Sequence, residues 1–254
     1  MTATTPLTTA FGIDIGGTGI KGGVVNLVDG TLIGDRFRLD TPQPATPDAV
    51  AATLHKIAAN FEYEGPFGCA FPGVVTHGVV HTAANVDESW IGVSLVDAAS
   101  GNVPGPVTAL NDADAAGLAE VRYGAGKGHP GLVIVVTFGT GIGTALIYNG
   151  QLIPNSELGH IELDGHDAES KAAASARERD DLSWEHWGKR ANRYLTHLEN
   201  LLWPELFIFG GGISKNPQKW VPYLSTRTPT KIAAMRNNAG IVGAALAAAE
   251  GQLA

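Results

Sequence analysis

A glycine-rich turn between two short apolar segments occurs twice in this chain, and this repetition constrains the fold more than any other feature. The turn residues are GGTG at 16–19 and GTGIG at 139–143. Short runs rich in Val and Ile on both sides of such a turn are typical of β-hairpins. The expected strands are residues 11–15 and 22–28 for the first hairpin, and 131–138 and 144–148 for the second.

Each hairpin is followed by further elements in a similar order. Residues 31–39 and 151–153 continue the two hairpins as third strands, and residues 82–104 are expected to be rich in loops. Such an approximate duplication predicts two α/β domains that share a cleft. Helical spacing of apolar residues predicts helices at 48–61, 114–123, 183–200 and 238–250, and short apolar runs predict buried strands at 67–71, 107–110 and 206–209.

The expected domain boundary follows from this repetition. We expect a smaller N-terminal α/β domain at residues 1–110 and a larger C-terminal α/β domain at residues 111–237. The closing helix, within residues 238–254, is expected to pack back on the N-terminal domain.

Composition excludes several classes of protein. With 44% hydrophobic and 17% charged residues, the 254-residue chain can bury a large core. Its net charge of −8 disfavours a nucleic-acid or anionic-membrane partner. The single cysteine, Cys69, excludes an internal disulfide and a Cys-based zinc cluster, and it favours a cytoplasmic location. The polar first ten residues predict no secretory signal, and glycines interrupt the most apolar stretch, residues 132–148, so no membrane span is expected.

The first glycine turn has the composition of a phosphate-binding loop. Gly16 and Gly17 would let backbone N–H groups approach phosphate oxygens, and Thr18 adds a hydroxyl. Lys21 adds a positive charge, and Asp14 could hold Mg²⁺ through water. No Walker A motif is present. A purely structural hairpin, with Asp14 capping the turn, is the alternative.

Two further glycine segments repeat this chemistry. The second turn contributes Thr137, Gly139, Thr140 and Gly141, and the pair of turns is stronger evidence than either alone. Gly211-Gly212 follows an apolar strand and is expected to open a helix that could receive an anionic group. A loop that simply needs unusual φ values is the alternative.

Two polar pairs are candidates for contact with a hydroxyl-rich substrate. Asn111-Asp112 ends a short strand, where a carboxylate could orient a hydroxyl and accept its proton, although helix capping by Asp112 or Asp114 is the alternative. Glu157 and His160 are three residues apart and could face one pocket. A pair of this kind can equally be a surface pair.

Taken in order, five segments resemble the sugar-kinase branch of the ROK family. The segments are GIDIGGTGIKGGVV, LNDADAAGLAE, TFGTGIGTALI, ELGHIELDG and FIFGGGISK, between residues 12 and 215. The resemblance implies a two-domain actin/hexokinase-like (ribonuclease H-like) α/β fold with an interdomain cleft.

The resemblance also implies roles for individual residues. Asp112 is the expected catalytic base, and Mg²⁺ near Asp14 is the expected cofactor. The expected sugar ligands are Asn85, Asn111, Asp112, Glu157, His160 and Glu169. The expected phosphate ligands are Asp14, Gly16, Gly17, Thr18, Lys21, Thr137, Gly139, Thr140, Gly141, Gly211 and Gly212.

One departure from the family narrows the resemblance. Many ROK members follow the ELGH segment with a cysteine-rich zinc cluster, but residues 161–185 contain no cysteine. No zinc is therefore expected, and Glu169 is taken as the counterpart of the glutamate that follows that cluster. The zinc-free form most resembles the polyphosphate glucokinases and the polyphosphate/ATP glucomannokinases. A basic track for polyphosphate could involve Lys21, Lys127, Lys215, Lys219, Arg190 and Arg193, unless these are ordinary solvated charges.

The expected activity is transfer of a phosphoryl group from polyphosphate or ATP to the 6-hydroxyl of glucose or mannose, by a homodimer. A strictly ATP-dependent kinase for glucose or an N-acetyl amino sugar is the nearest alternative. A sugar-responsive repressor is disfavoured, because only ten residues precede the first strand. A non-catalytic nucleotide-binding ATPase of the actin/Hsp70 type would not need the Asn111-Asp112 and Glu157–His160 pairs. A non-catalytic ROK/actin-like sugar or nucleotide sensor is a more remote alternative.

Overall fold

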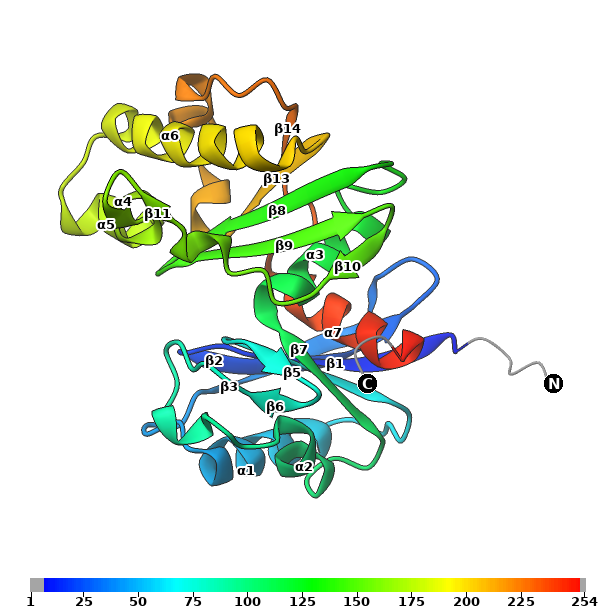
Figure 1. Ribbon diagram of the computed structural model, residues 1–254. Helices are drawn as coiled ribbons and strands as arrows, with labels where there is room; N and C mark the ends of the chain where they lie inside the picture. Colours follow the sequence, from blue (N-terminus) through cyan, green and yellow to red (C-terminus); the bar gives the residue numbers. More distant parts are fainter. Residues whose placement is uncertain (1–6, 252–254) are drawn as a thin grey trace. The chain divides into compact units, whose positions relative to one another are not determined.

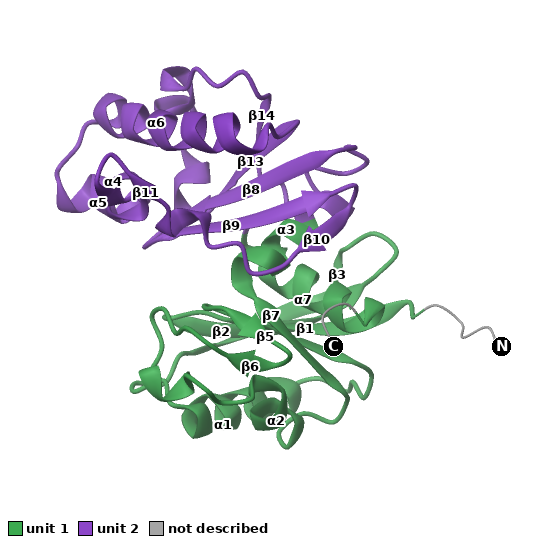
Figure 2. Ribbon diagram, in the orientation of Figure 1, with its two compact units in different colours: residues 1–119, 237–254 green, residues 120–236 purple. Residues whose placement is uncertain are grey.

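The computed structural model describes residues 7–251 (Figure 1). Residues 1–6 and 252–254 lie outside the described residues. They include most of the N-terminal segment in which no secretory signal is expected. They also include the last residues of the range 238–254, which is expected to hold the closing helix. Two compact units are formed, one from Met1–Ala119 with Asn237–Ala254 and the other from Glu120–Arg236 (Figure 2). This division falls at residue 119 rather than at residue 110. Among the described residues, no helix combines the length and apolar character that a membrane span requires.

The first unit is built on a five-stranded sheet with helices on both faces. The strand order is β3-β2-β1-β4-β7, in which β1 pairs antiparallel with β2 and parallel with β4. Helices α1 and α2 cover one face, and α7 packs against β1, β4 and β7 on the other (Figure 1). The elements are β1 Thr9–Ile15, β2 Gly19–Asn26, β3 Leu32–Asp40, α1 Pro47–Ala58, β4 Phe67–Phe71, β5 Val75–Thr76, β6 Val79–Val80, α2 Leu95–Ser100, β7 Val107–Asn111, α3 Asp112–Arg122 and α7 Ala239–Glu250.

The second unit is built on a sheet of the same design. Its strand order is β10-β9-β8-β13-β14, and β8 pairs antiparallel with β9 and parallel with β13. The shared order confirms the expected duplication at the level of elements. The elements are β8 Leu132–Phe138, β9 Ile142–Tyr148, β10 Gln151–Ile153, η2 Leu158–His160, β11 Glu162–Leu163, β12 His166–Asp167, α4 Glu169–Ala172, α5 Ala174–Arg179, α6 Trp184–Leu202, β13 Leu206–Gly210, η3 Gly212–Lys215 and β14 Thr230–Ile232.

Helix α6 supplies the core on one face of the second sheet. Ser183 begins it by accepting a hydrogen bond from the His186 amide at 3.2 Å. Trp187 packs edge-on against Phe138 of β8, with ring centroids 5.5 Å apart, and donates its indole N–H to the Ala173 carbonyl at 3.0 Å. The buried indole therefore satisfies its polar atom while it joins the helix to the sheet.

Helix α7 approaches the first sheet closely enough for backbone to meet backbone. A Cβ added at Gly12 of β1 would lie 1.8 Å from the Ile241 carbonyl oxygen, and one at Gly68 of β4 would lie 1.8 Å from the Ala244 oxygen. On the helix itself, a Cβ at Gly243 would lie 1.7 Å from the Ala115 oxygen of α3. Glycine at these positions is therefore a packing requirement of the first unit.

Two local features differ from expectation. The loop-rich residues 82–104 also contain helix α2, which Ser94 caps by accepting from the Asp97 amide at 3.0 Å. Six residues are too few to show a helical period in the sequence. After Gly212 the chain forms short 3-10 turns instead of the expected α-helix, because Pro217 and Pro222 remove two backbone donors.

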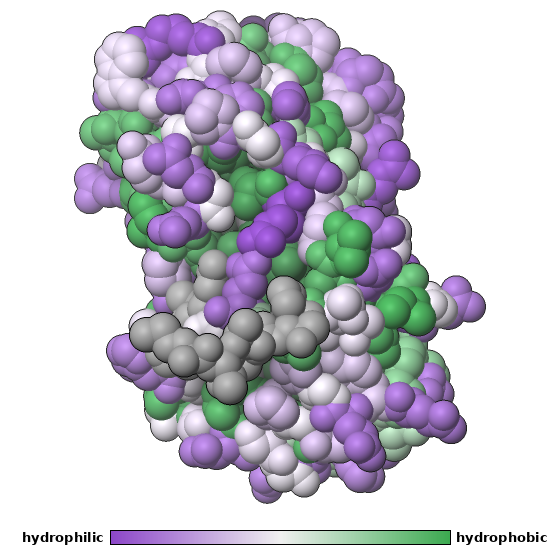
Figure 3. Space-filling model, turned by 90° about the vertical axis from the view of Figure 1, so that its right-hand side faces the viewer, coloured by the Kyte–Doolittle hydropathy of each residue, from purple (hydrophilic) through white to green (hydrophobic). Residues whose placement is uncertain are grey.

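Several large apolar side chains of the described residues lie exposed on the surface. On the face that Figure 3 presents, hydrophobic residues are interspersed among hydrophilic ones. Trp203, at the end of α6, is 69% exposed, and the Arg227 guanidinium lies 4.3 Å from its ring centroid. That cation covers part of the indole and lowers the cost of its exposure.

The close approach of α7 predicts a strong effect of one added methyl group. Gly68→Ala should lower the free energy of unfolding by about 2–3 kcal/mol, because the new Cβ overlaps the Ala244 carbonyl. Thermal unfolding should show a fall of about 4–10 °C in Tm. Gly101→Ala is the matched control, since its Cβ would meet no atom within 4 Å and its φ of −77° suits alanine. Equal Tm values for both variants would contradict the close packing.

Candidate functional site

The first glycine turn is anchored by a cross-strand ion pair. Asp14 on β1 lies opposite Lys21 on β2, and the Lys21 Nζ lies 2.9 Å from Asp14 Oδ2. Lys21 also donates to the Asn237 carbonyl at 3.1 Å. Both side chains are mostly buried, with 17% of Asp14 and 24% of Lys21 exposed. The Lys21 charge is therefore committed to Asp14 in this structure.

Three carbonyl groups of the turn accept hydrogen bonds, and two of its amides are available. Gly16 donates its N–H to the Gly19 carbonyl at 3.1 Å, and Thr41 donates its hydroxyl to the Gly16 carbonyl. Arg38 donates to the Thr18 carbonyl at 2.9 Å. Within residues 7–251, the N–H groups of Gly17 and Thr18 donate no hydrogen bond. Two consecutive available amides in a tight turn form an anion-binding concavity.

Asn85 lies against this turn. A Cβ at Gly17 would be 2.8 Å from the Asn85 Cβ, so glycine at position 17 is also required by this neighbour. Asn85 adopts φ of +63°, a left-handed conformation that asparagine tolerates better than most residues. The structure therefore brings together a sugar-ligand candidate and the first phosphate-loop candidate.

Asn111, rather than Asp112 or Asp114, caps helix α3. The Asn111 Oδ1 accepts from the amides of Ala113 at 2.8 Å and Asp114 at 3.1 Å, and its Nδ2 donates to the Gly73 carbonyl at 3.1 Å. The expectation that the Asn111-Asp112 segment caps the helix is therefore correct, but the capping residue is Asn111 and not Asp112 or Asp114. Asn111 is only 6% exposed, and much of the hydrogen-bonding capacity of its side chain serves the fold.

Asp112 stands at the first position of α3 and is half-buried. Its Oδ1 accepts a hydrogen bond from the Ala113 amide at 2.8 Å. An acidic group in the first turn is stabilised by the partial positive charge of the helix N-terminus. With the cap supplied by Asn111, the Asp112 carboxylate is held rigidly at the end of β7.

The second glycine turn repeats the arrangement of the first. Gly139 donates its N–H to the Gly141 carbonyl at 2.9 Å, while the Gly139 and Thr140 carbonyls accept from the amide and the hydroxyl of Ser175. In the part of the chain that the structure describes, the amides of Thr140 and Gly141 donate to no other group. Thr137 uses its hydroxyl within the hairpin, donating to the Gly143 carbonyl at 3.3 Å.

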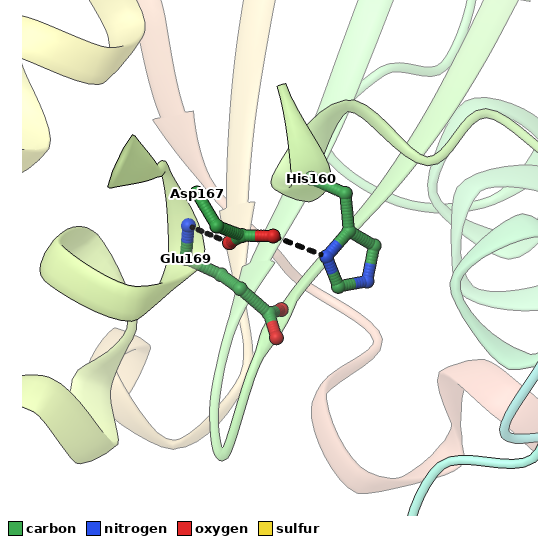
Figure 4. Close-up of side chains that lie close together, drawn as sticks. All are labelled: His160, Asp167 and Glu169. Carbon is green, nitrogen blue, oxygen red and sulfur yellow. Dashed lines mark hydrogen bonds and ion pairs between the residues drawn. The ribbon is translucent and has the colours of Figure 1, made fainter. Parts of the chain in front are cut away.

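Glu169 connects this turn to a polar cluster. Its Oε2 accepts from the Ile142 amide at 2.9 Å, and a Cβ at Gly141 would lie 2.4 Å from the same oxygen. Glu169 also lies beside His160 and Asp167, and ligand atoms of all three are within 4.8 Å of one another (Figure 4). The structure thus places Glu169 beside His160, which is also an expected sugar ligand.

Glu157 and His160 face each other across one turn of chain. The His160 Nε2 lies 3.9 Å from Glu157 Oε2, and the His160 Nδ1 lies 2.9 Å from Asp167 Oδ2. The hydrogen bond to Asp167 is the main cause that raises the pKa of His160 above its ordinary value. Burial raises the pKa of Glu157, and the neighbouring imidazole opposes that shift.

The two glycines after β13, Gly211 and Gly212, differ in whether the fold requires glycine there. Gly211 adopts φ of +78°, and a Cβ there would lie 2.3 Å from the Phe138 carbonyl oxygen, so glycine is required by the fold. At Gly212 a Cβ would meet nothing within 4 Å. The open space at Gly212 has no packing explanation among the described residues, and it leaves the backbone approachable.

Some of the candidate cations for a polyphosphate track are already paired. Arg190 lies 2.7 Å from Asp180, and Arg193 lies 2.7 Å from Asp164. Hydrogen bonds from Arg179 and Arg190 lower the pKa of Asp180 to about 2. The two arginines border a cavity of about 370 Å³ in the second unit, but their charges are largely balanced there. Lys219 lies over the Trp184 ring at 5.4 Å.

Sequence reasoning missed Asp167 and Arg38. Asp167 contacts His160 from a different element, and no spacing rule links residues seven apart in a loop. Arg38 sits on β3 and reaches the Thr18 carbonyl, which follows from the pairing of β2 with β3 and not from any motif. A cross-strand register for β2 and β3 could have indicated Arg38.

Comparison with known proteins gives the family of this chain. Residues 10–174 match the ROK family. Over 238 residues the chain is 59% identical to a polyphosphate glucokinase of Mycobacterium tuberculosis, covering 93% of this chain and 90% of that protein. The chain belongs to the ROK family. This membership confirms the resemblance drawn from the five segments.

Solved ROK structures share the fold. The inorganic polyphosphate/ATP-glucomannokinase from Arthrobacter sp. strain KM is 53% identical, with a TM-score of 0.91 over 97% of this chain and 100% of that one. A ROK glucokinase from Streptomyces griseus, solved in complex with glucose and AMPPNP, is 26% identical, with a TM-score of 0.80 over 95% and 99% of the two chains. The expected actin/hexokinase-like α/β fold is therefore confirmed.

The Asp14–Lys21 pair predicts a stability effect that a surface pair would not give. Lys21→Met should lower the free energy of unfolding by about 1–3 kcal/mol, because the mostly buried Asp14 carboxylate loses its counter-charge. Lys189→Met is the control: it removes the exposed pair with Glu185 and should cost less than about 0.5 kcal/mol. Urea unfolding of both variants measures the difference. Equal losses would show that the Asp14–Lys21 pair behaves as a solvated surface pair.

Proposed function

We propose that this ROK protein is a hexose kinase. It transfers a phosphoryl group from inorganic polyphosphate or ATP to the 6-hydroxyl of glucose, and mannose is the second candidate acceptor. The observation that carries this proposal is the 59% identity, across 93% of the chain, to a polyphosphate glucokinase. The 53% identity to a polyphosphate/ATP-glucomannokinase supports the same donors and acceptors.

Asp112 is the proposed catalytic base. Phosphoryl transfer depends mainly on positioning and on electrostatic stabilisation, with a carboxylate that orients the attacking hydroxyl and accepts its proton late in the reaction. The support for Asp112 is its fixed place at the junction of β7 and α3, where Asn111 supplies the helix cap. The Asp112 carboxylate is therefore not required as the cap.

The remaining polar residues are assigned by chemical type. Available amides at Gly17, Thr18, Thr140 and Gly141 are proposed to bind phosphoryl oxygens, together with the approachable backbone at Gly212. Backbone amides stabilise developing charge without the reorganisation that flexible cations need. The proposed sugar ligands are Asn85, Asn111 and Asp112 of the first unit, and Glu157, His160 and Glu169 of the second.

Asp14 is the residue proposed to hold Mg²⁺. One mostly buried carboxylate beside a glycine turn suits a cation that keeps several waters and is otherwise held by substrate phosphates. Lys21 already balances part of the Asp14 charge, which fits contact through water rather than direct ligation. When bound, Mg²⁺ would neutralise charge on the donor phosphates.

A cytoplasmic location and a homodimeric state belong to the same proposal. The support for the location is the single cysteine, Cys69, which is fully buried in the first unit. The homodimer rests on the family resemblance alone, and analytical ultracentrifugation of the full chain tests it.

Donor use gives the first test of the proposed function. The purified chain should phosphorylate glucose with long-chain polyphosphate in nucleotide-free buffer, and also with ATP. Coupled detection of glucose 6-phosphate measures both reactions. Product with ATP but none with polyphosphate would favour the strictly ATP-dependent alternative. Product with neither donor, for glucose, mannose or N-acetyl amino sugars, would remove the kinase function.

The role of Asp112 gives the second test. Asp112→Asn should lower kcat by about 10²- to 10⁴-fold, since a general base contributes an effect of that size. The KM for glucose should stay within a few fold, because an amide can still accept a hydrogen bond. Asp48→Asn, an exposed first-turn aspartate on α1, is the matched control and should retain full turnover. Near-normal kcat in Asp112→Asn would show that another group is the base.

A further inference from the structure

The imidazole of His160 is held by an aspartate that no motif indicated. Asp167, on the short strand β12, places its Oδ2 2.9 Å from the His160 Nδ1 (Figure 4). An ionised carboxylate can only accept a hydrogen bond, so the Nδ1 of His160 must carry a proton. The two side chains come from different elements, which makes the contact a product of the tertiary fold.

The second oxygen of Asp167 is also used. Its Oδ1 accepts from the Glu169 amide at 3.1 Å and from the Ser170 amide at 3.4 Å, both in the first turn of α4. The Ser170 hydroxyl returns a bond to the Asp167 carbonyl at 2.6 Å. One side chain therefore joins the turn that carries His160 to the helix that carries Glu169.

The hydrogen bond to Asp167 fixes the orientation of the His160 ring and therefore the direction in which Nε2 points. With Nδ1–H donated to Asp167, the Nε2 of neutral His160 is an acceptor, and protonation converts it to a donor. Nε2 lies on the side of Glu157, 3.9 Å from its Oε2. His160 keeps 53% of its side chain exposed, so a hydroxyl-bearing ligand can reach it.

We propose that Asp167 is a positioning residue for sugar recognition. It fixes the tautomer and ring orientation of His160, so that Nε2 faces the acceptor sugar, and it aligns the first turn of α4 so that Glu169 faces the same ligand. This inference rests on the proposed function, in which His160 and Glu169 contact the hexose. Asp167 itself touches neither donor nor acceptor in this assignment.

The charges around His160 give the pair a pH dependence. Asp167, Glu157 and Glu169 face the ring, and all three raise its pKa, while burial lowers it. The raised pKa means that the pair stabilises the fold fully below the ordinary histidine pKa of about 6.5, and this contribution is lost as the pH rises through the higher folded value. Removal of the Asp167 charge should move the titration of His160 to lower pH.

A cation site formed by the same three residues is the competing explanation. Ligand atoms of His160, Asp167 and Glu169 lie within 4.8 Å of one another. However, Nδ1 and Oδ2 lie at hydrogen-bonding distance, and Oδ1 of Asp167 already accepts from two amides. The geometry is that of a group of side chains whose hydrogen bonds are satisfied. Titration with and without added metal distinguishes this explanation from a cation site.

Asp167→Asn is the informative substitution, because an amide cannot serve both partners. If its oxygen caps α4, its NH₂ faces Nδ1 and reverses the tautomer; if its oxygen faces Nδ1, its NH₂ opposes the α4 amides. We expect the KM for glucose to rise by about 3- to 10-fold, as for the loss of one hydrogen bond, while kcat changes by less than about 2-fold. The KM for the donor should stay unchanged.

Asp164→Asn is the matched control. Asp164 lies in the turn between β11 and β12, pairs with Arg193 and adopts φ of +55°, which asparagine tolerates. Its KM values should equal those of the wild type. Asp167→Ala, which removes the hydrogen bonds of both carboxylate oxygens, should raise the glucose KM further than Asp167→Asn. An unchanged glucose KM in both Asp167 variants, with an active wild type, would overturn the inference.

A spectroscopic arm separates this inference from the proposed function. ¹H–¹⁵N correlation spectra of the imidazole groups, without substrate, should show Nδ1 protonated in neutral His160 of the wild type and a lower pKa in Asp167→Asn. The same titration with EDTA, and with added Zn²⁺ or Mg²⁺, should not change. An unshifted His160 pKa in the variant, or a shift that depends on the metal, would contradict positioning by Asp167. If the wild type phosphorylates no sugar, the proposed function fails, and the sugar-recognition role fails with it even where the spectra show the pair.

Discussion

Backbone contact between α7 and the first sheet is the constraint on which the first unit depends. The helix touches β1 and β4 at Gly12 and Gly68, and it touches α3 through Gly243 and Ala115. The same helix therefore supports the strand that ends in the first glycine turn and the helix that begins at Asp112. Because no side chain separates these backbones, the spacing cannot relax gradually. A carboxylate at the start of α3 gains its rigidity from this packing as well as from the cap by Asn111.

Recognition of anions by a chain of net charge −8 needs local donors, and the amides of the two glycine turns are the proposed donors. The Gly16 and Thr18 carbonyls in the first turn, and the Gly139 and Thr140 carbonyls in the second, accept hydrogen bonds. Within the described residues, two consecutive amides in each turn donate none. Lys21, the cation next to the first turn in sequence, is paired with Asp14. Oriented N–H groups can attract phosphate without a large positive surface. The acidic balance of the chain is thus compatible with a polyanionic donor.

Local chemistry explains what could be predicted from sequence. The hairpins around residues 16–19 and 139–143 follow from the glycine turns and the Val- and Ile-rich runs beside them, and they are present with the expected topology. Helices α2, α4 and α5 were missed because four to six residues show no periodicity. The cap at α3 was assigned to the wrong neighbour, since Asn111 and Asp112 have similar propensities. Asp167 could not be found at all, because its meaning arises only when β12 lies beside the turn that carries His160.

The first unit is discontinuous in sequence, and this has a consequence for its synthesis. A ribosome that has produced residues 1–119 has not yet made Asn237–Ala254, so the helix that covers β1 and β4 arrives only after the whole second unit. Until then the face of the sheet that carries Gly12 and Gly68 lacks α7. Residues 120–236 are contiguous and can fold as a unit once they have emerged. The unit that starts translation first is therefore the one that completes its core last.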